Sequence, residues 1–135
     1  MVTPGTKDNP WKLKTAPGTS AFEMYNDINK EGKNILVCVV GKTILHYDGR
    51  VVNDLHTMLK KHGTWIDLGG ADEQKPANEN TVEAWGRASD NPIGGWYGLK
   101  KGLRGRLGVY VPPLLEVLGL AEITHEAKNN KMRAK

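Results

Sequence analysis

The sequence has little cysteine and no long apolar run. Its one cysteine, Cys38, lies in ILVCVV, the longest apolar stretch. A single cysteine forms no disulfide within the chain, so we expect a packed thiol in a reducing compartment. No apolar run reaches the length of a membrane-spanning helix, and the first 14 residues lack the apolar region of a signal peptide. We therefore predict a cytoplasmic protein with no membrane partner.

Motifs of the common catalytic and cofactor sites are also missing. The segment before Gly41-Lys42-Thr43 has Leu36 where the phosphate-binding loop GxxxxGK[ST] needs its first glycine, and no GxGxxG occurs in the glycine-rich stretch. The sequence has no paired-cysteine metal motif. His125-Glu126 is not the start of HExxH, because residue 129 is asparagine. We predict no enzyme activity, no cofactor and no metal.

Carboxylates are absent from one long segment of the chain. None occurs between Asp90 and Glu116. The net charge is +4, with 11 basic and 12 acidic residues up to residue 90, and 8 basic and 3 acidic residues after it. The positive potential therefore belongs to the C-terminal third, and it indicates an anionic partner there.

The length and composition fit one ordinary domain or two small lobes that share a core. The chain has 135 residues, of which 39% are hydrophobic. Composition divides it into a flexible N-terminal arm over 1–18, an antiparallel β-sheet and helix unit over 19–68, an exposed loop over 69–80, and a helical basic region with a C-terminal hairpin over 81–135.

The unit over 19–68 reads as three strands and a helix. SAFEMY alternates apolar and polar residues, ILVCVV is continuously apolar, and the two-residue loop Gly41-Lys42 leads into TILHY. This pattern predicts a three-stranded antiparallel sheet. Apolar residues then recur at helical spacing between Asp48 and Gly63, which predicts a helix that covers one face of the sheet.

Helical signals follow the exposed loop. Asn80 and Glu83 resemble a capping box and predict a helix over 81–88. Pro112-Pro113 can open a second short helix, PLLEVL. Strands over 121–126 and 131–134 would then form a hairpin, with Asn129-Asn130 tolerating the positive φ of its turn.

The stretch GGWYGLKKGLRGRLG, residues 94–108, carries four basic residues, two aromatics and six glycines. On an ideal helix its tryptophan and leucines form one apolar stripe and four of its glycines lie opposite. Those glycines would cost roughly 1 kcal/mol each relative to alanine. Two interpretations stay open: a helix whose bare backbone admits another backbone, or a loop whose glycines adopt unusual dihedrals.

The segment LEVLGLAEITHEAKNNKMRA, residues 115–134, resembles the end of a winged-helix DNA-binding domain, in which a helix ends in Leu-Gly-Leu and a basic hairpin follows. In that family the helix reads the major groove with polar and basic side chains. PPLLEVL is apolar and carries Glu116, so contacts would move to Lys100–Arg106. With the earlier patterns, the resemblance implies an α+β fold: a three-stranded antiparallel sheet with a covering helix, then a helical, winged-helix-like C-terminal half ending in a β-hairpin.

These observations predict a non-catalytic protein that binds DNA or RNA through the phosphate backbone. The residues expected to contact phosphates are Lys100, Lys101, Arg104, Arg106, Lys128, Lys131 and Arg133. Trp96 and Tyr97 are candidates for stacking single-stranded bases, although a core position is the more common one for such a tryptophan. Four to seven neutralised phosphates would give a log-log salt slope of about −4 to −6 on duplex.

A second class of function stays open beside the first. The basic run can be a solvated face whose charges serve solubility, while the glycine face packs against a protein partner or a second copy of the chain in a homodimer. The sequence does not place the two basic groups, Lys100–Arg106 and Lys128–Arg133, relative to each other.

Overall fold

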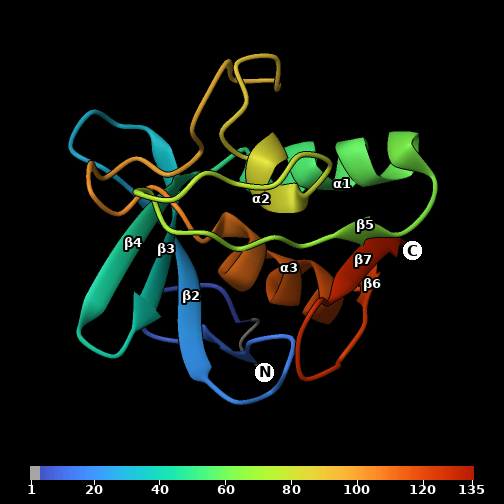
Figure 1. The fold of residues 1–135 in the computed structure, drawn as a ribbon. Coiled ribbons are helices and arrows are strands. Elements are labelled where there is room, and N and C mark those ends of the chain that lie inside the picture. The colour runs from blue at the N-terminus through green and yellow to red at the C-terminus, as the bar shows by residue number, and fades with distance from the viewer. Residues whose placement is uncertain (1–3) are drawn as a thin grey trace.

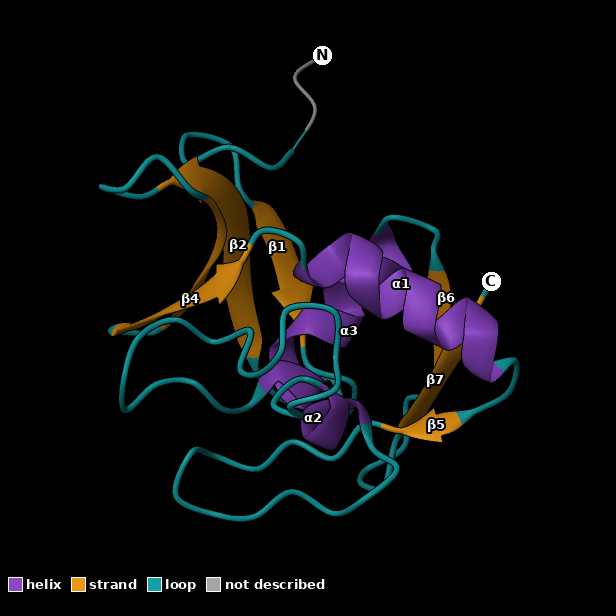
Figure 2. Cartoon of the chain, turned by 90° about the horizontal axis from the view of Figure 1, so that it is seen from above, coloured by secondary structure: helices purple, strands orange, loops and turns teal. Residues whose placement is uncertain are grey.

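Two antiparallel sheets flank a central helix in the computed structural model, which describes residues 4–135 (Figure 1). The first sheet has the order β1-β2-β3-β4 and the second has the order β5-β7-β6. Their strands are β1 (Trp11–Lys14), β2 (Ala21–Ile28), β3 (Asn34–Val40), β4 (Thr43–Asp48), β5 (Ile66–Asp67), β6 (Ala121–Ile123) and β7 (Lys131–Ala134). The helices are α1 (Val51–His62), α2 (Val82–Trp85) and α3 (Leu107–Val117). Figure 2 shows α3 between the two sheets, with α1 beside it.

The first sheet has four strands, so the prediction of three is wrong. The fourth strand, β1, lies in the segment predicted as a flexible arm, of which residues 1–3 lie outside the described part of the chain. Leu13 of β1 pairs with Phe22 of β2, and both side chains are buried. A four-residue strand holding one apolar alternation gives too weak a pattern to be recognised in the sequence.

Helix α1 forms where its apolar spacing predicts, but it does not cover the first sheet. It ends at Gly63 with φ 78°, and its buried face packs against α3 and β7. The first sheet is covered instead by α3, where Tyr110 meets Phe22 edge to face at 5.0 Å. The apolar period identified the helix, but it carries no information about which element lies against it.

The C-terminal half is not helical apart from α2 and α3, so the prediction of a helical, winged-helix-like half is wrong. Residues 86–106 form turns and loops, and the apolar stripe beginning at Trp96 is never assembled. Gly102 has φ 86° and Arg106 has φ 67°, both outside the helical region. The low helix propensity of the glycines therefore outweighs the spacing of the leucines.

The predicted C-terminal hairpin is present as β6 and β7. Met132 of β7 pairs with Ile66 on one side and with Ile123 on the other. All three side chains are buried and form the apolar face of the second sheet. Asn129 has φ 60° in the connecting turn, as predicted. Within residues 4–135, α1 is the longest helix at 12 residues, and none is long and apolar enough to cross a membrane.

Candidate binding groove

Three of the six glycines in the 94–108 stretch lie close against the protein's own backbone. A Cβ on Gly98 would overlap the backbone of Arg104, and one on Gly108 would overlap the carbonyl oxygen of Leu68. A Cβ on Gly105 would lie 2.7 Å from the backbone of the preceding loop. These three glycines are needed for close packing within the chain, so they offer no face to a partner.

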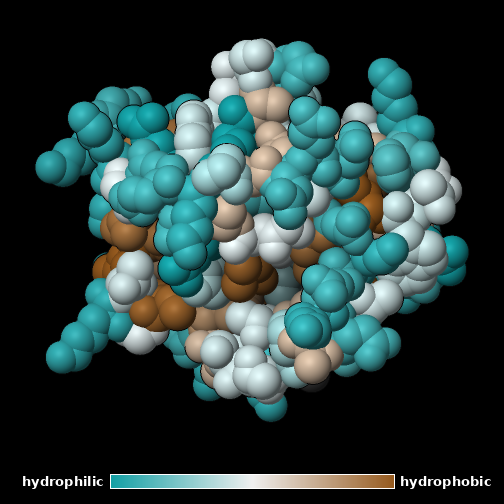
Figure 3. Space-filling model, in the orientation of Figure 1, coloured by the Kyte–Doolittle hydropathy of each residue, from teal (hydrophilic) through white to brown (hydrophobic). Residues whose placement is uncertain are grey.

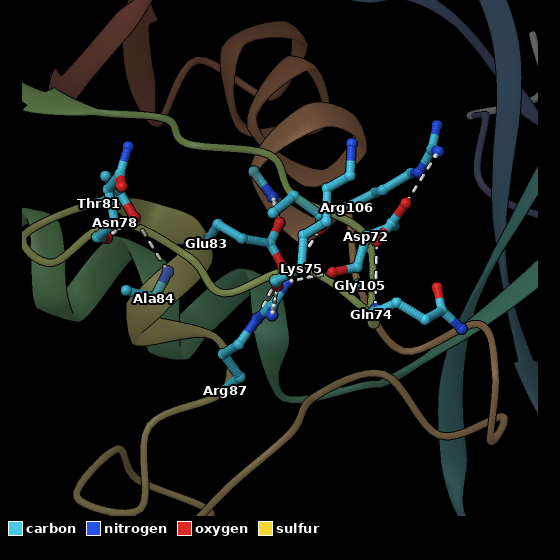
Figure 4. A network of polar contacts seen from close by, with 12 residues as sticks. Asp72, Gln74, Lys75, Asn78, Thr81, Glu83, Ala84, Arg87, Gly105 and Arg106 are labelled. Atoms are coloured by element: carbon cyan, nitrogen blue, oxygen red, sulfur yellow. Dashed lines mark hydrogen bonds and ion pairs between the residues drawn. The ribbon is translucent and has the colours of Figure 1, made fainter.

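A buried carboxylate fixes the start of α3 (Figure 4). Glu83 is 1% exposed, and one of its oxygens accepts the backbone N–H of Gly108 at 2.9 Å. Its other oxygen pairs with Arg87 at 2.7 Å. Burial raises the pKa of the Glu83 carboxyl, while Arg87 and the Gly108 N–H counter that shift by stabilising the charged form. Glu83 thus complements the positive end of the α3 dipole.

Arg87 fixes the loop over 69–80. Its guanidinium donates hydrogen bonds to the carbonyl oxygens of Ala71 at 2.9 Å, Asp72 at 3.1 Å and Lys75 at 2.9 Å. It also lies 4.5 Å from the centre of the Trp96 ring, a cation-π contact. The predicted exposed loop is therefore held against the glycine-rich stretch along its first half.

The loop over 69–80 brings its carboxylates next to the glycine-rich stretch, which has no acidic residue of its own. The Arg106 guanidinium lies 3.8 Å from Asp72, and the Arg104 guanidinium lies 3.9 Å from Glu73. Sequence reasoning missed this compensation because more than thirty residues separate the partners. Both distances exceed hydrogen-bond range, so the pairs are loose.

The structure places the predicted binding residues at several separate locations. The ammonium of Lys100 donates to the carbonyl oxygen of Ile44 on β4 at 3.2 Å, and Lys101 is exposed on the following turn. Arg133 lies over the Trp65 ring at 4.6 Å and pairs with Glu122 at 3.4 Å.

Of the two aromatic candidates, one is buried and the other is half-buried. Tyr97 is fully buried and its hydroxyl donates to Asp54 at 2.7 Å. Burial and Asp54 raise the pKa of the Tyr97 hydroxyl far above its ordinary value. Trp96 is half-buried beside Arg87. The ring of Tyr97 therefore offers no surface to a base in this structure.

Three of the predicted residues line one groove. Arg106, Lys128 and Lys131 border a cavity of about 930 Å³ whose floor is the start of α3. Its walls are the turn over 15–20, the loop over 67–81 and the turn over 127–131. In Figure 1 these segments surround the front of α3, and Figure 3 shows apolar surface at the centre of this face with polar surface around it.

A smaller cavity of about 320 Å³ adjoins the first and shares Val40, Arg106 and Tyr110 with it. We call the two cavities together the α3 groove. Arg106 lies where they meet, and its side chain is 54% exposed. The residue that precedes α3 is thus the one basic residue, among those described, that borders both cavities.

Arg106 has an unusual backbone conformation. Its φ is 67° and its N–H donates to the carbonyl oxygen of Ala71 at 2.8 Å. The other described non-glycine residues with positive φ are Asn80 and Asn129, and asparagine tolerates that region. A non-glycine residue in this region costs of order 1–2 kcal/mol of folding free energy. The chain has arginine at this position, although glycine occurs at several neighbouring ones.

Asn130 positions the turn that carries Lys128 and Lys131. Its side-chain oxygen accepts the N–H of Glu126 at 2.7 Å and the hydroxyl of Thr124 at 2.9 Å, and its amide donates to the carbonyl of Glu126 at 3.0 Å. The Asn130 carbonyl accepts the N–H of Leu68 at 3.0 Å. The hairpin turn and the loop that follows β5 therefore form a continuous wall of the α3 groove.

The described residues hold neither an activated cysteine nor a metal-binding cluster. Burial raises the pKa of the Cys38 thiol to about 12, so the thiolate nucleophile is not formed near neutral pH. Residues 4–135 hold no group of three or more His, Cys, Asp or Glu side chains placed to bind a metal ion.

A family model matches residues 3–135, nearly the whole chain. Its description is a family of unknown function (DUF6855), and the chain belongs to this family. No curated protein and no solved structure matches the chain.

Proposed function

We propose that this member of the DUF6855 family is a non-catalytic nucleic-acid-binding protein, whose α3 groove contacts phosphates through Arg106, Lys128 and Lys131. The observation that carries the proposal is the position of these residues. They come from the two basic groups of the sequence, at least 22 residues apart, and they line one cavity.

The donors of these side chains are available to a ligand. Arg106 and Lys131 lie 3.8 and 3.7 Å from Asp72 and Asp67, and within the described residues no hydrogen bond engages either cationic group. Loose, exposed ion pairs contribute roughly 0–1 kcal/mol. A phosphate oxygen can approach to about 2.8 Å and form stronger, charge-assisted bonds.

The mode of binding differs from major-groove reading. Helix α3 is buried on nearly all sides, from Leu107 to Leu115, so it presents no row of polar side chains to base edges. Phosphate contacts position a nucleic acid without specifying its sequence. Three contacts give a log-log salt slope of about −2 on a single strand and about −3 on duplex, smaller than the −4 to −6 expected for all predicted residues.

Fluorescence anisotropy of labelled oligonucleotides across a salt series tests the proposal. The variant Arg106→Gln, Lys128→Gln, Lys131→Gln removes three charges from the groove. The matched control Lys30→Gln, Lys60→Gln, Lys61→Gln removes three exposed charges that lie outside it. We expect binding by the wild type and the control, and a loss of at least tenfold in the groove variant. Equal affinity of the two variants would contradict the proposal.

A second candidate function is an interaction with a protein or with a second copy of the chain. It would not use Gly98, Gly105 or Gly108, because these three glycines pack internally. Exposed apolar side chains lie elsewhere, at Val117 (58% exposed) and Leu118 (41%). If no oligonucleotide binds at low salt, sedimentation of the wild type beside Val117→Ser, Leu118→Ser tests self-association. The cytoplasmic location remains a prediction.

A further inference from the structure

We propose that the α3 groove is built for a single strand, with a phosphate on Arg106 and an unpaired base against the apolar floor beside it. This inference rests on the proposed function, because it names the form of nucleic acid that the same groove accepts.

The groove is a path that passes Arg106. On one side, the smaller cavity reaches Leu45 of β4 and Leu103 of the glycine-rich stretch. On the other side, the larger cavity reaches the turn with Lys128 and Lys131. An extended chain that follows this path meets cationic donors at its centre and at one end.

The floor beside Arg106 is apolar. Val109 and Tyr110 line the larger cavity, and Tyr110 continues into the smaller one with Leu45 and Leu103. Tyr110 is 8% exposed, and its ring meets the Phe22 ring edge to face at 5.0 Å. Figure 3 shows a hydrophobic patch near the centre of this face, with hydrophilic side chains around it.

A ligand for this groove must therefore offer negative charge and apolar faces within one residue's length. Duplex nucleic acid offers phosphates, but its bases are stacked inside and their faces are not available to Val109 or Tyr110. A single strand offers a phosphate and an unstacked base at each step, and the face of such a base can lie against the apolar side chains of the floor without regard to sequence.

Carboxylates in the groove are consistent with this choice. Asp67, Asp72 and Glu79 lie among the lining residues of the two cavities. They repel phosphates but accept hydrogen bonds from the amino groups of unpaired bases. In a duplex these amino groups are largely committed to pairing. The acidic residues thus disfavour a ligand whose surface is negative throughout. They favour a chain in which phosphates alternate with hydrogen-bond donors.

Three probes of equal length and label separate the alternatives by anisotropy at one salt concentration: a single-stranded oligonucleotide of mixed sequence, its duplex, and an abasic strand with the same phosphates and no bases. We expect the single strand to bind at least tenfold more tightly than either of the others, the usual contribution of one stacked base. Equal binding of the duplex or of the abasic strand would overturn the inference while leaving phosphate binding intact. Failure of all three to bind at low salt would overturn the proposed function as well.

The variant Tyr110→Leu tests the floor directly, with Phe22→Leu as the control, because Phe22 contacts the Tyr110 ring but lines neither cavity of the groove. We expect Tyr110→Leu to weaken single-strand binding about tenfold and to leave abasic binding unchanged. Phe22→Leu should change neither. If Tyr110→Leu does not fold, the abasic comparison on the wild-type protein still decides. Equal effects of Tyr110→Leu on the abasic and intact strands would contradict the proposed contact.

Discussion

The Arg106 guanidinium lies 3.8 Å from the Asp72 carboxylate, beside the cavities that meet at Arg106. At this separation the guanidinium makes no hydrogen bond to the carboxylate, and both side chains are partly exposed to solvent, at 54% and 32%. Asp72 is fixed through its backbone by Arg87. The carboxylate is therefore a weak competitor for the cation and does not occupy its hydrogen-bonding capacity.

Asp72→Asn should strengthen oligonucleotide binding. The change removes a negative charge that competes for Arg106 and retains the oxygen that accepts the N–H of Gln74. A loose pair of this kind contributes up to about 1 kcal/mol, so we expect a two- to fivefold gain in affinity by anisotropy. Glu31→Gln makes the same charge change at an exposed site outside the groove. An equal gain in that control would show that only net charge matters.

Arg106→Gly and Arg106→Ala should differ in stability but not in binding. Both remove the side chain, and only glycine relieves the positive φ of 67°. We expect the free energy of unfolding, measured with urea, to be about 1–2 kcal/mol higher for the glycine variant than for the alanine variant. Both variants should lose oligonucleotide affinity. Identical unfolding curves would mean that the backbone at residue 106 relaxes without strain.

Gly98→Ala should destabilise the protein far more than Gly95→Ala. A Cβ at Gly98 would overlap the Arg104 backbone, whereas one at Gly95 would meet no atom within 4 Å. Overpacking against a backbone typically costs about 1–3 kcal/mol of unfolding free energy. Thermal unfolding of both variants measures the difference. Comparable loss in the two would contradict the close approach of segments 98 and 104.

His125 should make stability depend on pH. One ring nitrogen lies 2.9 Å from the carbonyl oxygen of Ala16 and the other lies 2.6 Å from the Glu116 carboxylate. Both partners accept hydrogen bonds, so the two bonds together require the protonated ring. The Ala16 carbonyl and Glu116 raise the pKa of His125.

The stabilisation from a raised histidine pKa is fully present below about pH 6.5, the unfolded value, and is lost as the pH rises through the folded value. The free energy of unfolding of the wild type should therefore fall as the pH rises above about 6.5. His125→Gln should show a flatter dependence over the same range. Parallel curves for the two proteins would contradict this role.

Elements with strong local patterns could be predicted from the sequence. The continuous run around Cys38 became β3, and the apolar spacing up to Gly63 became α1. The turn at Asn129 formed because asparagine tolerates a positive φ. Each of these depends on neighbours in the chain, and local sequence records that information.

The remainder depends on distant contacts. In the glycine-rich stretch, Gly98 and Gly105 pack against backbone that the sequence does not place beside them. The pairing of Arg106 with Asp72 across 34 positions is likewise invisible to a count of charges within a segment. Of the candidate site, the residue types were predictable. Their placement was not predictable: Arg106 lines the groove, whereas the Lys100 ammonium bonds to a carbonyl of β4.

Amide chemical-shift mapping during titration with a single-stranded oligonucleotide tests the groove most directly, since it locates the contact surface without any substitution. We expect the shifts to concentrate in three segments that line the groove: Gly70 and Ala71, the start of α3 with Arg106, Gly108, Val109 and Tyr110, and the turn over 127–131. Saturating shifts confined to the outer surface of α1 or to the turn between β2 and β3 would contradict binding in the α3 groove.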